Sequence, residues 1–142
     1  MIITGRGVGR GPEINRSYVT VMDLAPTFIE IAGARYPDDG SVQPMLGESM
    51  APLLAGDGDA VHDEAYITAL YHRGRAFVRK GRWKLTNLEP PFDPAEFELY
   101  DLESDPGETS NLADTRPEVL QEMRAAWDRE RRRLGIILPS DL

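Results

Sequence analysis

Four carboxylates crowd one short stretch of the chain, namely Asp101, Glu103, Asp105 and Glu108. Carboxylate oxygens are the ligands that Ca²⁺ prefers, but a twelve-residue calcium loop needs Gly at its sixth and Glu at its twelfth position. Counting from Asp101, these positions hold Pro106 and Leu112. The pair Pro106-Gly107 is typical of a tight turn, because Pro presets φ and Gly accepts positive φ. The sequence therefore favours a solvated acidic turn over a metal site.

Histidine and cysteine offer little further chemistry. The chain has no cysteine, which removes disulfides, thiolate metal sites and cysteine nucleophiles together. Its two histidines, His62 and His72, are isolated in the sequence, and a histidine pair alone does not make a zinc site. We therefore predict no catalytic residue and no metal ligand within this chain, and no cofactor bound by it.

The overall charge limits the partners of the protein. The net charge is −8 with a pI of about 4.7, so nucleic-acid binding is not expected, since phosphate neutralisation needs clustered Lys and Arg. The local arginine cluster from Arg129 to Arg133 suits the end of a helix. The apolar runs are too short to cross a bilayer, and the first residues lack a signal-peptide pattern. We expect a cytoplasmic location for this chain.

The first element that must position any site is a helix within residues 18–33. Asp23 is a good N-cap, and Gly33 is a typical residue to follow the helix end. Leu24, Phe28 and Ile31 recur at helical spacing and form one apolar stripe.

A β region follows, built around a hairpin. Residues 75–79 and 83–87 flank Lys80-Gly81, which we predict as the two-residue turn. This turn pairs Val78 with Trp83 and places Ala76, Val78, Trp83 and Leu85 on one apolar face. The other face is basic, with Arg75, Arg79, Arg82 and Lys84. Residues 64–70 and 97–102 supply two more strands.

The longest helix is predicted over residues 115–134, with Thr115 and Glu118 as a capping box. Its apolar stripe of Leu120, Met123, Trp127 and Leu134 must cover an apolar surface, and the sheet is the natural partner. The expected fold class is α+β. It has a small antiparallel sheet of about four strands, a long C-terminal helix on one face, and an N-terminal helical segment.

Four stretches, taken as strings, resemble one family in the expected order. They are SYVTVMDLAPTFIEIAGA from Ser17, the G-x-S-x-x-P-L-L-x-G pattern from Gly47, the hairpin from Arg75 to Leu85, and ELYDLESDPGETSNLA from Glu98. Together they resemble the C-terminal region of sulfatases, which belong to the alkaline-phosphatase-like superfamily. The resemblance implies a domain division: residues 1–16 are a Gly/Arg-rich edge of a missing catalytic domain, and residues 17–142 are a sulfatase-like C-terminal domain.

The resemblance also implies which chemistry is missing. Sulfatases use a formylglycine made in a C/S-x-P-x-R motif, beside a divalent cation such as Ca²⁺. The nearest match here, Ser104 to Glu108, has Glu where the motif needs Arg. Such a chain lacks the nucleophile and the metal ligands, and we expect a C-terminal subdomain or fragment of an arylsulfatase-like sulfuric ester hydrolase that is inactive alone.

By the same resemblance, His72 and Arg73 would edge the substrate pocket once the larger domain is present. Two alternatives stay open: the same region of a phosphonate or phosphate monoester hydrolase, and a stand-alone module that binds anions through its basic strand face. The expected partner is the missing N-terminal catalytic domain, or a second copy that associates through exposed apolar surface such as Ile136 to Leu138. The parent enzyme could be periplasmic.

Overall fold

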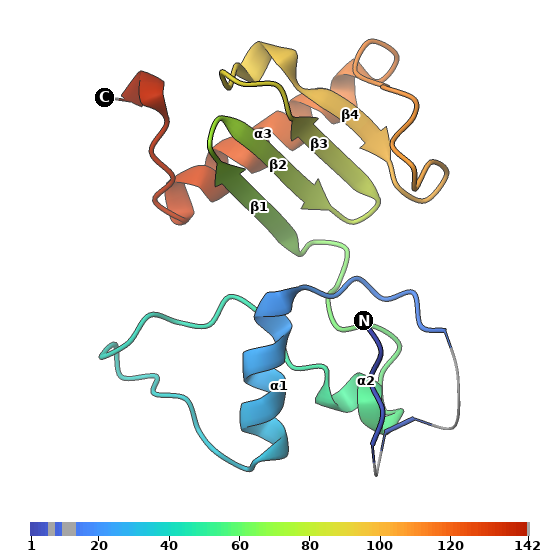
Figure 1. The fold of residues 1–142 in the computed structure, drawn as a ribbon, viewed down its shortest axis with the longest axis vertical. Coiled ribbons are helices and arrows are strands. Elements are labelled where there is room, and N and C mark those ends of the chain that lie inside the picture. The colour runs from blue at the N-terminus through green and yellow to red at the C-terminus, as the bar shows by residue number, and fades with distance from the viewer. Residues whose placement is uncertain (6–7, 10–13, 142) are drawn as a thin grey trace. The chain divides into compact units, whose positions relative to one another are not determined.

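The computed structural model describes residues 1–5, 8–9 and 14–141. The chain divides into two compact units, Met1–Asp63 (unit 1) and Glu64–Leu142 (unit 2), which are drawn in Figure 1. The Gly/Arg-rich start at residues 1–16 lies partly outside the described residues, at 6–7 and 10–13. The domain boundary after residue 16 therefore stays a prediction.

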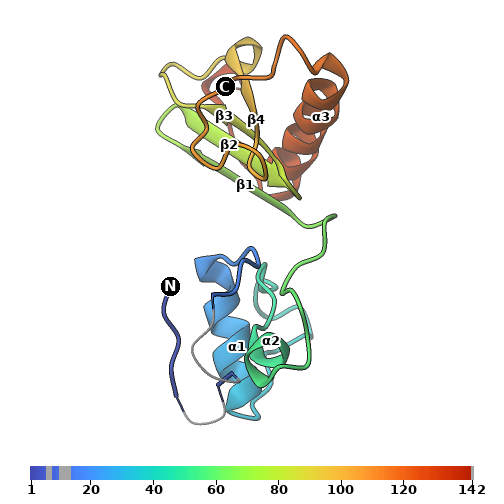
Figure 2. The same cartoon turned by 90° about the vertical axis from the view of Figure 1, so that its right-hand side faces the viewer.

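Unit 2 is the α+β fold that the sequence predicts. Its four-stranded antiparallel sheet has the order β1-β2-β3-β4, with β1 at Ile67–His72, β2 at Arg75–Lys80, β3 at Trp83–Asn87 and β4 at Glu98–Asp101. Helix α3 (Pro117–Arg133) runs along one face of this sheet (Figure 2). The core between them contains Val78, Leu85, Leu99, Met123 and Trp127, each at most 2% exposed.

The register of the central hairpin differs from the predicted one by two residues. Lys80 pairs with Trp83 and Val78 with Leu85, so the two-residue turn is Gly81-Arg82. Gly81 has φ of +54° whereas Arg82 is not in the positive-φ region, which is the pattern of a type II′ turn. A shift of two residues preserves which side chains share a face. The predicted apolar face is therefore present although the predicted pairs are wrong.

Helix α3 begins two residues later than predicted. Pro117 occupies its first turn, where a missing N–H costs no intrahelical bond, and Arg116 precedes it. The predicted capping box is wrong, because the Thr115 hydroxyl donates to the Leu112 carbonyl instead. The predicted stripe is correct at its centre, where Met123 and Trp127 are buried against the sheet.

Unit 1 contains α1 (Leu24–Ile31) and α2 (Ala51–Ala55). A short 3-10 helix precedes α1 at Val21–Asp23, and two others lie in unit 2 at Pro94–Glu96 and Pro139–Asp141. Asp23 occupies the N-cap position of α1 as predicted, but its side chain does not cap that helix. Thr20 caps the preceding 3-10 turn, and the Asp23 carboxylate accepts a hydrogen bond from the Thr20 N–H. Gly33, with φ of +63°, follows the helix end as predicted. Among the described residues, no helix is both long and apolar enough to cross a membrane.

Two of the three residues in the predicted apolar stripe of α1 point outward, while Leu24 is half-buried. Phe28 is 65% and Ile31 is 66% exposed, whereas Asp23 and Thr27 are buried. The hydroxyl of Thr27 accepts a hydrogen bond from the Met50 N–H at 2.8 Å, so the inward side of this helix is held by polar contacts.

Candidate functional site

The structure places His72 and Arg73 at the tip of the β1–β2 hairpin. His72 ends β1 and pairs with Arg75, and the two-residue turn between them is Arg73-Gly74. Both turn residues have positive φ, +49° and +79°, which defines a type I′ turn. Both His72 and Arg73 are exposed. The two predicted site residues are therefore adjacent and accessible.

Arg73 occupies a backbone position that suits Asn or Gly better. A non-glycine residue in the left-handed region costs about 1 kcal/mol. The turn is braced by the loop after β3: the Arg75 Nε donates to the Leu88 carbonyl at 2.9 Å, and Gly74 lies so near Pro90 that an added Cβ would be 3.2 Å from the Pro90 Cβ. A strained residue on a braced turn is a feature often found at functional sites.

The sequence predicts a solvated acidic turn, but the structure buries one of its carboxylates. Asp101 is only 6% exposed, and it accepts hydrogen bonds from the Arg82 guanidinium, the Ser104 hydroxyl and the Glu103 N–H. The Arg82 contact is the main reason why the pKa of Asp101 lies well below its usual range. This carboxylate is a structural anchor between the β2–β3 turn and the end of β4.

The other three carboxylates of the cluster are also engaged. Glu103 pairs with Arg82 at 2.7 Å, and Glu108 pairs with Lys84 at 2.6 Å. The Asp105 carboxylate accepts from the N–H groups of Thr109 and Ser110, and the Ser110 contact is the first reason for its lowered pKa. Within the described part of the chain, no group of three His, Cys, Asp or Glu side chains could hold a metal.

The formylglycine and divalent cation that sulfatases use do not fit the residues present here. In the nearest motif match the Asp105 carboxylate caps its own loop, and Glu108 is paired with a lysine. A sulfate ester needs cationic groups around it, and this loop supplies carboxylates instead.

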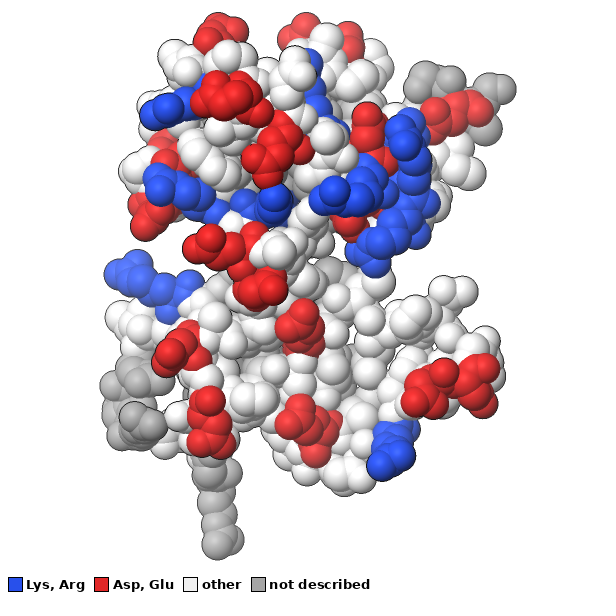
Figure 3. Space-filling view, turned by 180° about the vertical axis from the view of Figure 1, so that it is seen from behind, with Lys and Arg blue, Asp and Glu red and all other residues white. Residues whose placement is uncertain are grey.

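The basic strand face is also largely occupied by internal contacts. Arg82 and Lys84 pair with carboxylates, while the Nε groups of Arg75 and Arg79 donate to backbone carbonyls. Figure 3 shows Lys and Arg side chains of unit 2 lying beside Asp and Glu side chains. These contacts weaken the interpretation of the face as an anion-binding surface.

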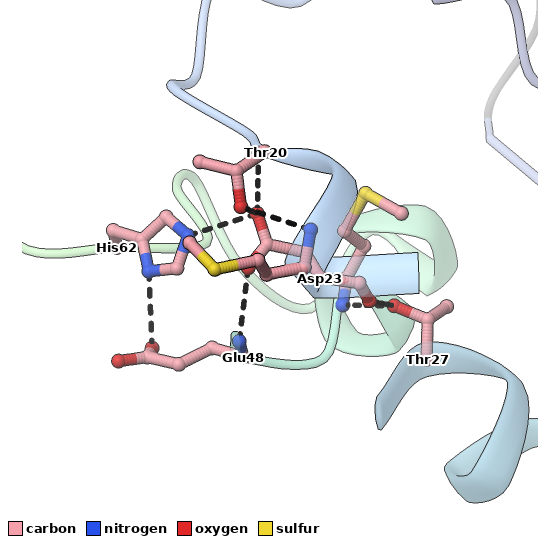
Figure 4. A network of polar contacts seen from close by, with 7 residues as sticks. Thr20, Asp23, Thr27, Glu48 and His62 are labelled. Atoms are coloured by element: carbon pink, nitrogen blue, oxygen red, sulfur yellow. Dashed lines mark hydrogen bonds and ion pairs between the residues drawn. The ribbon is translucent and has the colours of Figure 1, made fainter. Parts of the chain in front are cut away.

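Unit 1 holds a buried polar network that the sequence analysis missed (Figure 4). Asp23 is 0% exposed, and its carboxylate accepts from the N–H groups of Thr20 at 2.6 Å and Glu48 at 3.0 Å. His62 Nε2 lies 3.0 Å from Asp23 Oδ2, and its Nδ1 lies 3.7 Å from Glu48 Oε2. Burial acts to raise the pKa of Asp23, but the hydrogen bonds from Thr20, His62 and Glu48 outweigh it and leave the pKa below its ordinary value.

This network resembles the base and orienting acid of a hydrolase but cannot act as one. A catalytic triad needs a nucleophile beside the second ring nitrogen of the histidine. A glutamate occupies that place next to His62, and the His62 side chain is 1% exposed. We interpret the network as structural, since it ties the start of α1 to the segment before α2 and to residue 62.

Unit 2 also has a pocket of about 580 Å³ at the ends of β3 and β4. Four carboxylates and a single cation line it, namely Glu89, Glu96, Glu98, Asp114 and Arg124. Its negative lining repels anions, so this pocket is not suited to a sulfate ester.

The fold and these sites define an α+β domain with exposed hairpin-tip residues and, in its described part, no group of His, Cys, Asp or Glu side chains that could hold a metal. The model of the family described as N-sulphoglucosamine sulphohydrolase, C-terminal, matches residues 7–133. The chain belongs to this family of sulfatase C-terminal regions, which confirms the resemblance seen in the four sequence stretches.

Known relatives agree. The chain is 30% identical to an uncharacterized sulfatase of Schizosaccharomyces pombe, covering 90% of this chain and 24% of that protein. It is also 30% identical to human arylsulfatase A, covering 80% and 26%. A solved structure of a 2-O GAG sulfatase superposes with a TM-score of 0.68 at 26% identity, covering 93% of this chain and 29% of that one. The chain thus spans about a quarter of the length of the curated relatives it matches.

Proposed function

We propose that this chain is the C-terminal region of an arylsulfatase-like sulfuric ester hydrolase, and that it has no hydrolytic activity by itself. The observation that carries the proposal is the family match over residues 7–133, combined with a length of about a quarter of the sulfatases it resembles. In such an enzyme the formylglycine and the divalent cation would come from the larger region. The formylglycine would supply the nucleophile, and the cation would supply positive charge near the sulfate. We propose that this chain contains neither.

The first test is hydrolysis by the 142-residue chain alone. We expect no release of nitrophenol from p-nitrophenyl sulfate, phosphate or phenylphosphonate above the buffer blank, with or without Ca²⁺, because the chain has no C/S-x-P-x-R motif. Among its described residues, no group of side chains could hold the cation. The DNA upstream of Met1 should encode, in frame, a region with a C/S-x-P-x-R motif. Activity that follows the pure chain, or an upstream frame without this motif, would contradict the proposal. The same three substrates, tried on the longer polypeptide, separate a sulfatase from a phosphate or phosphonate hydrolase.

We further propose that the hairpin tip with His72 and Arg73 borders the substrate pocket of the longer enzyme. Its exposure and the strained backbone of Arg73 support this role. The electrostatic reason is that an exposed cation near a pocket favours an anionic substrate.

The variant Arg73→Asn tests the hairpin tip without harming the fold, because Asn suits positive φ in a type I′ turn. In the longer polypeptide we expect KM for an aryl sulfate to rise about tenfold, because the substitution removes one charge-assisted hydrogen bond to the substrate. Arg73→Lys, which keeps the charge, should retain most of the affinity. Unchanged KM in Arg73→Asn would show that the tip lies away from the substrate.

A further inference from the structure

The hairpin tip and the acidic pocket of unit 2 lie at the same end of the sheet. The strand registers require this, because β1 ends at His72, β2 begins at Arg75, and Asn87 at the end of β3 pairs with Ala76 (Figure 1). The loop after β3 joins the two features. Its residue Leu88 lines the pocket, and the Leu88 carbonyl accepts the hydrogen bond from Arg75 Nε at 2.9 Å. A substrate that contacts the tip can therefore extend toward the pocket.

Two residues that line this pocket have a buried polar atom without a hydrogen-bond partner among the described residues. Asn87 is 2% exposed, and its Nδ2 donates to the Asp93 carbonyl at 2.7 Å, which leaves Oδ1 as an unpaired acceptor. Arg124 donates from Nη2 to the Ala95 carbonyl at 3.0 Å, but its buried Nε is an unpaired donor. Buried polar groups in proteins are nearly always paired, so this combination points to a ligand.

The chemistry of these two atoms favours a hydroxyl group. A hydroxyl can donate one hydrogen bond, to Asn87 Oδ1, and can accept another, from Arg124 Nε. An ammonium group cannot accept a hydrogen bond, and an ionised carboxylate or sulfate cannot donate one. A ligand group of either charge would therefore satisfy only one of the two atoms.

The rim of the pocket selects against negative charge. Glu89, Glu96 and Asp114 line it, are exposed, and form no hydrogen bond or ion pair within the described part of the chain. Arg124 is the one cation among the lining residues that the structure describes. Because like charges repel, a ligand with an anionic group in this pocket would bind less well than an uncharged one.

We infer that this pocket receives an uncharged, hydroxyl-bearing part of a sulfate ester and rejects substrates with a second anionic group. This inference rests on the proposed function, because the sulfate would be hydrolysed by the longer enzyme next to the hairpin tip. The cation of the tip attracts the sulfate, while the rim carboxylates select the rest of the substrate. Glu89, Glu96 and Asp114 are then residues that determine specificity.

A matched pair of substrates tests the inference in the longer polypeptide encoded in frame upstream of Met1. Both are p-nitrophenyl sulfates, one with an ortho hydroxymethyl group and one with an ortho carboxylate. The measured quantity is the ratio of kcat/KM for the hydroxymethyl ester to kcat/KM for the carboxylate ester. Comparing this ratio between wild type and variants cancels the intrinsic reactivity of the two esters.

The variants Glu96→Gln and Asp114→Asn each remove one rim charge. We expect the ratio to fall about threefold in each and about tenfold when they are combined, since the repulsion of two unit charges about 7 Å apart in water changes a rate constant by this order. Glu118→Gln is the matched control and should keep the wild-type ratio, because Glu118 is exposed on α3 and does not line the pocket. Added salt should lower the wild-type ratio, since it screens the rim charges.

Arg124→Lys tests the hydroxyl contact separately, because it keeps a cation but removes the Nε–H group. In wild type we expect KM for the hydroxymethyl ester to be about fivefold lower than KM for unsubstituted p-nitrophenyl sulfate, the effect of one additional hydrogen bond. This advantage should disappear in Arg124→Lys.

The inference has clear contrary outcomes. An unchanged ratio in Glu96→Gln and Asp114→Asn would overturn it, and so would an equal change in Glu118→Gln. A hydroxymethyl advantage that survives in Arg124→Lys would refute the hydroxyl contact. A longer polypeptide that hydrolyses none of the three sulfates would refute the proposed function and this inference with it, a result that differs from hydrolysis without charge selection.

Discussion

Asp23→Asn is expected to destabilise unit 1 by about 3 kcal/mol, because a neutral amide with a single acceptor oxygen replaces a buried, charged carboxylate that accepts several hydrogen bonds. Asp23 Oδ2 accepts from both the Thr20 N–H and the Thr20 hydroxyl and lies beside His62. An asparagine offers one acceptor oxygen, so its NH₂ group would face either these donors or the Glu48 N–H.

The measurement can separate the two units. Both tryptophans, Trp83 and Trp127, belong to unit 2, so tryptophan fluorescence reports on unit 2. Hydrogen exchange of residues 20–31 reports on unit 1. We expect faster exchange there in Asp23→Asn and an unchanged fluorescence transition. Asp38→Asn, at an exposed carboxylate of the same unit, is the matched control. Equal exchange in both variants would show that the network contributes no stability.

The same carboxylate should make unit 1 sensitive to acid. The pKa of Asp23 is lowered in the folded state, so its stabilising contribution is complete above its unfolded value of about 4. That contribution is lost as the pH falls through the folded pKa. The exchange difference between wild type and Asp23→Asn should therefore shrink as the pH falls below about 4.

Gly47→Ala is expected to destabilise unit 1 by a similar amount, about 3 kcal/mol. A Cβ at Gly47 would collide with the Met22 carbonyl oxygen and come within 2.6 Å of the Asp23 nitrogen. Both are backbone atoms, so the loop must move, and the Glu48 N–H would leave the Asp23 carboxylate. The effect is steric, since Gly47 does not have positive φ.

Gly58→Ala is the matched control for this prediction. It lies in the same unit, has no positive φ, and its nearest neighbour to an added Cβ is 3.9 Å away. Hydrogen exchange of residues 20–31 should rise in Gly47→Ala and stay near wild type in Gly58→Ala. If Gly47→Ala exchanged no faster than its control, the close approach of the two segments would not matter for stability.

Local patterns predicted unit 2 well, and the errors have physical causes. The alternation of apolar residues fixes which side chains face α3, so the core around Val78 and Leu85 could be predicted. The register could not, because Gly81 fits either position of a two-residue turn, and a shift of two residues leaves the apolar face unchanged. The capping box at Thr115 failed because Pro117 already suits the first turn of the helix.

The sites were harder to predict, because their contacts are distant in sequence. The carboxylate of Asp23 contacts Glu48 and His62, which follow it in the sequence by 25 and 39 positions. No periodic pattern encodes contacts at such distances in sequence. The Asp23 side chain does not cap α1, because it forms a capping box with Thr20 instead. The helical spacing of Leu24, Phe28 and Ile31 was predictable, but the outward direction of Phe28 and Ile31 was not, since periodicity does not reveal which side of a helix is buried. The pocket role of His72 and Arg73 stays a prediction.

The strand order of unit 2 has a consequence for folding kinetics. Each strand pairs with the next one along the chain, and two of the three connections are two-residue turns. Contacts that are near in sequence close small loops, and such topologies fold faster than those with distant pairings. We therefore expect this sheet to form early and without help from a preceding region.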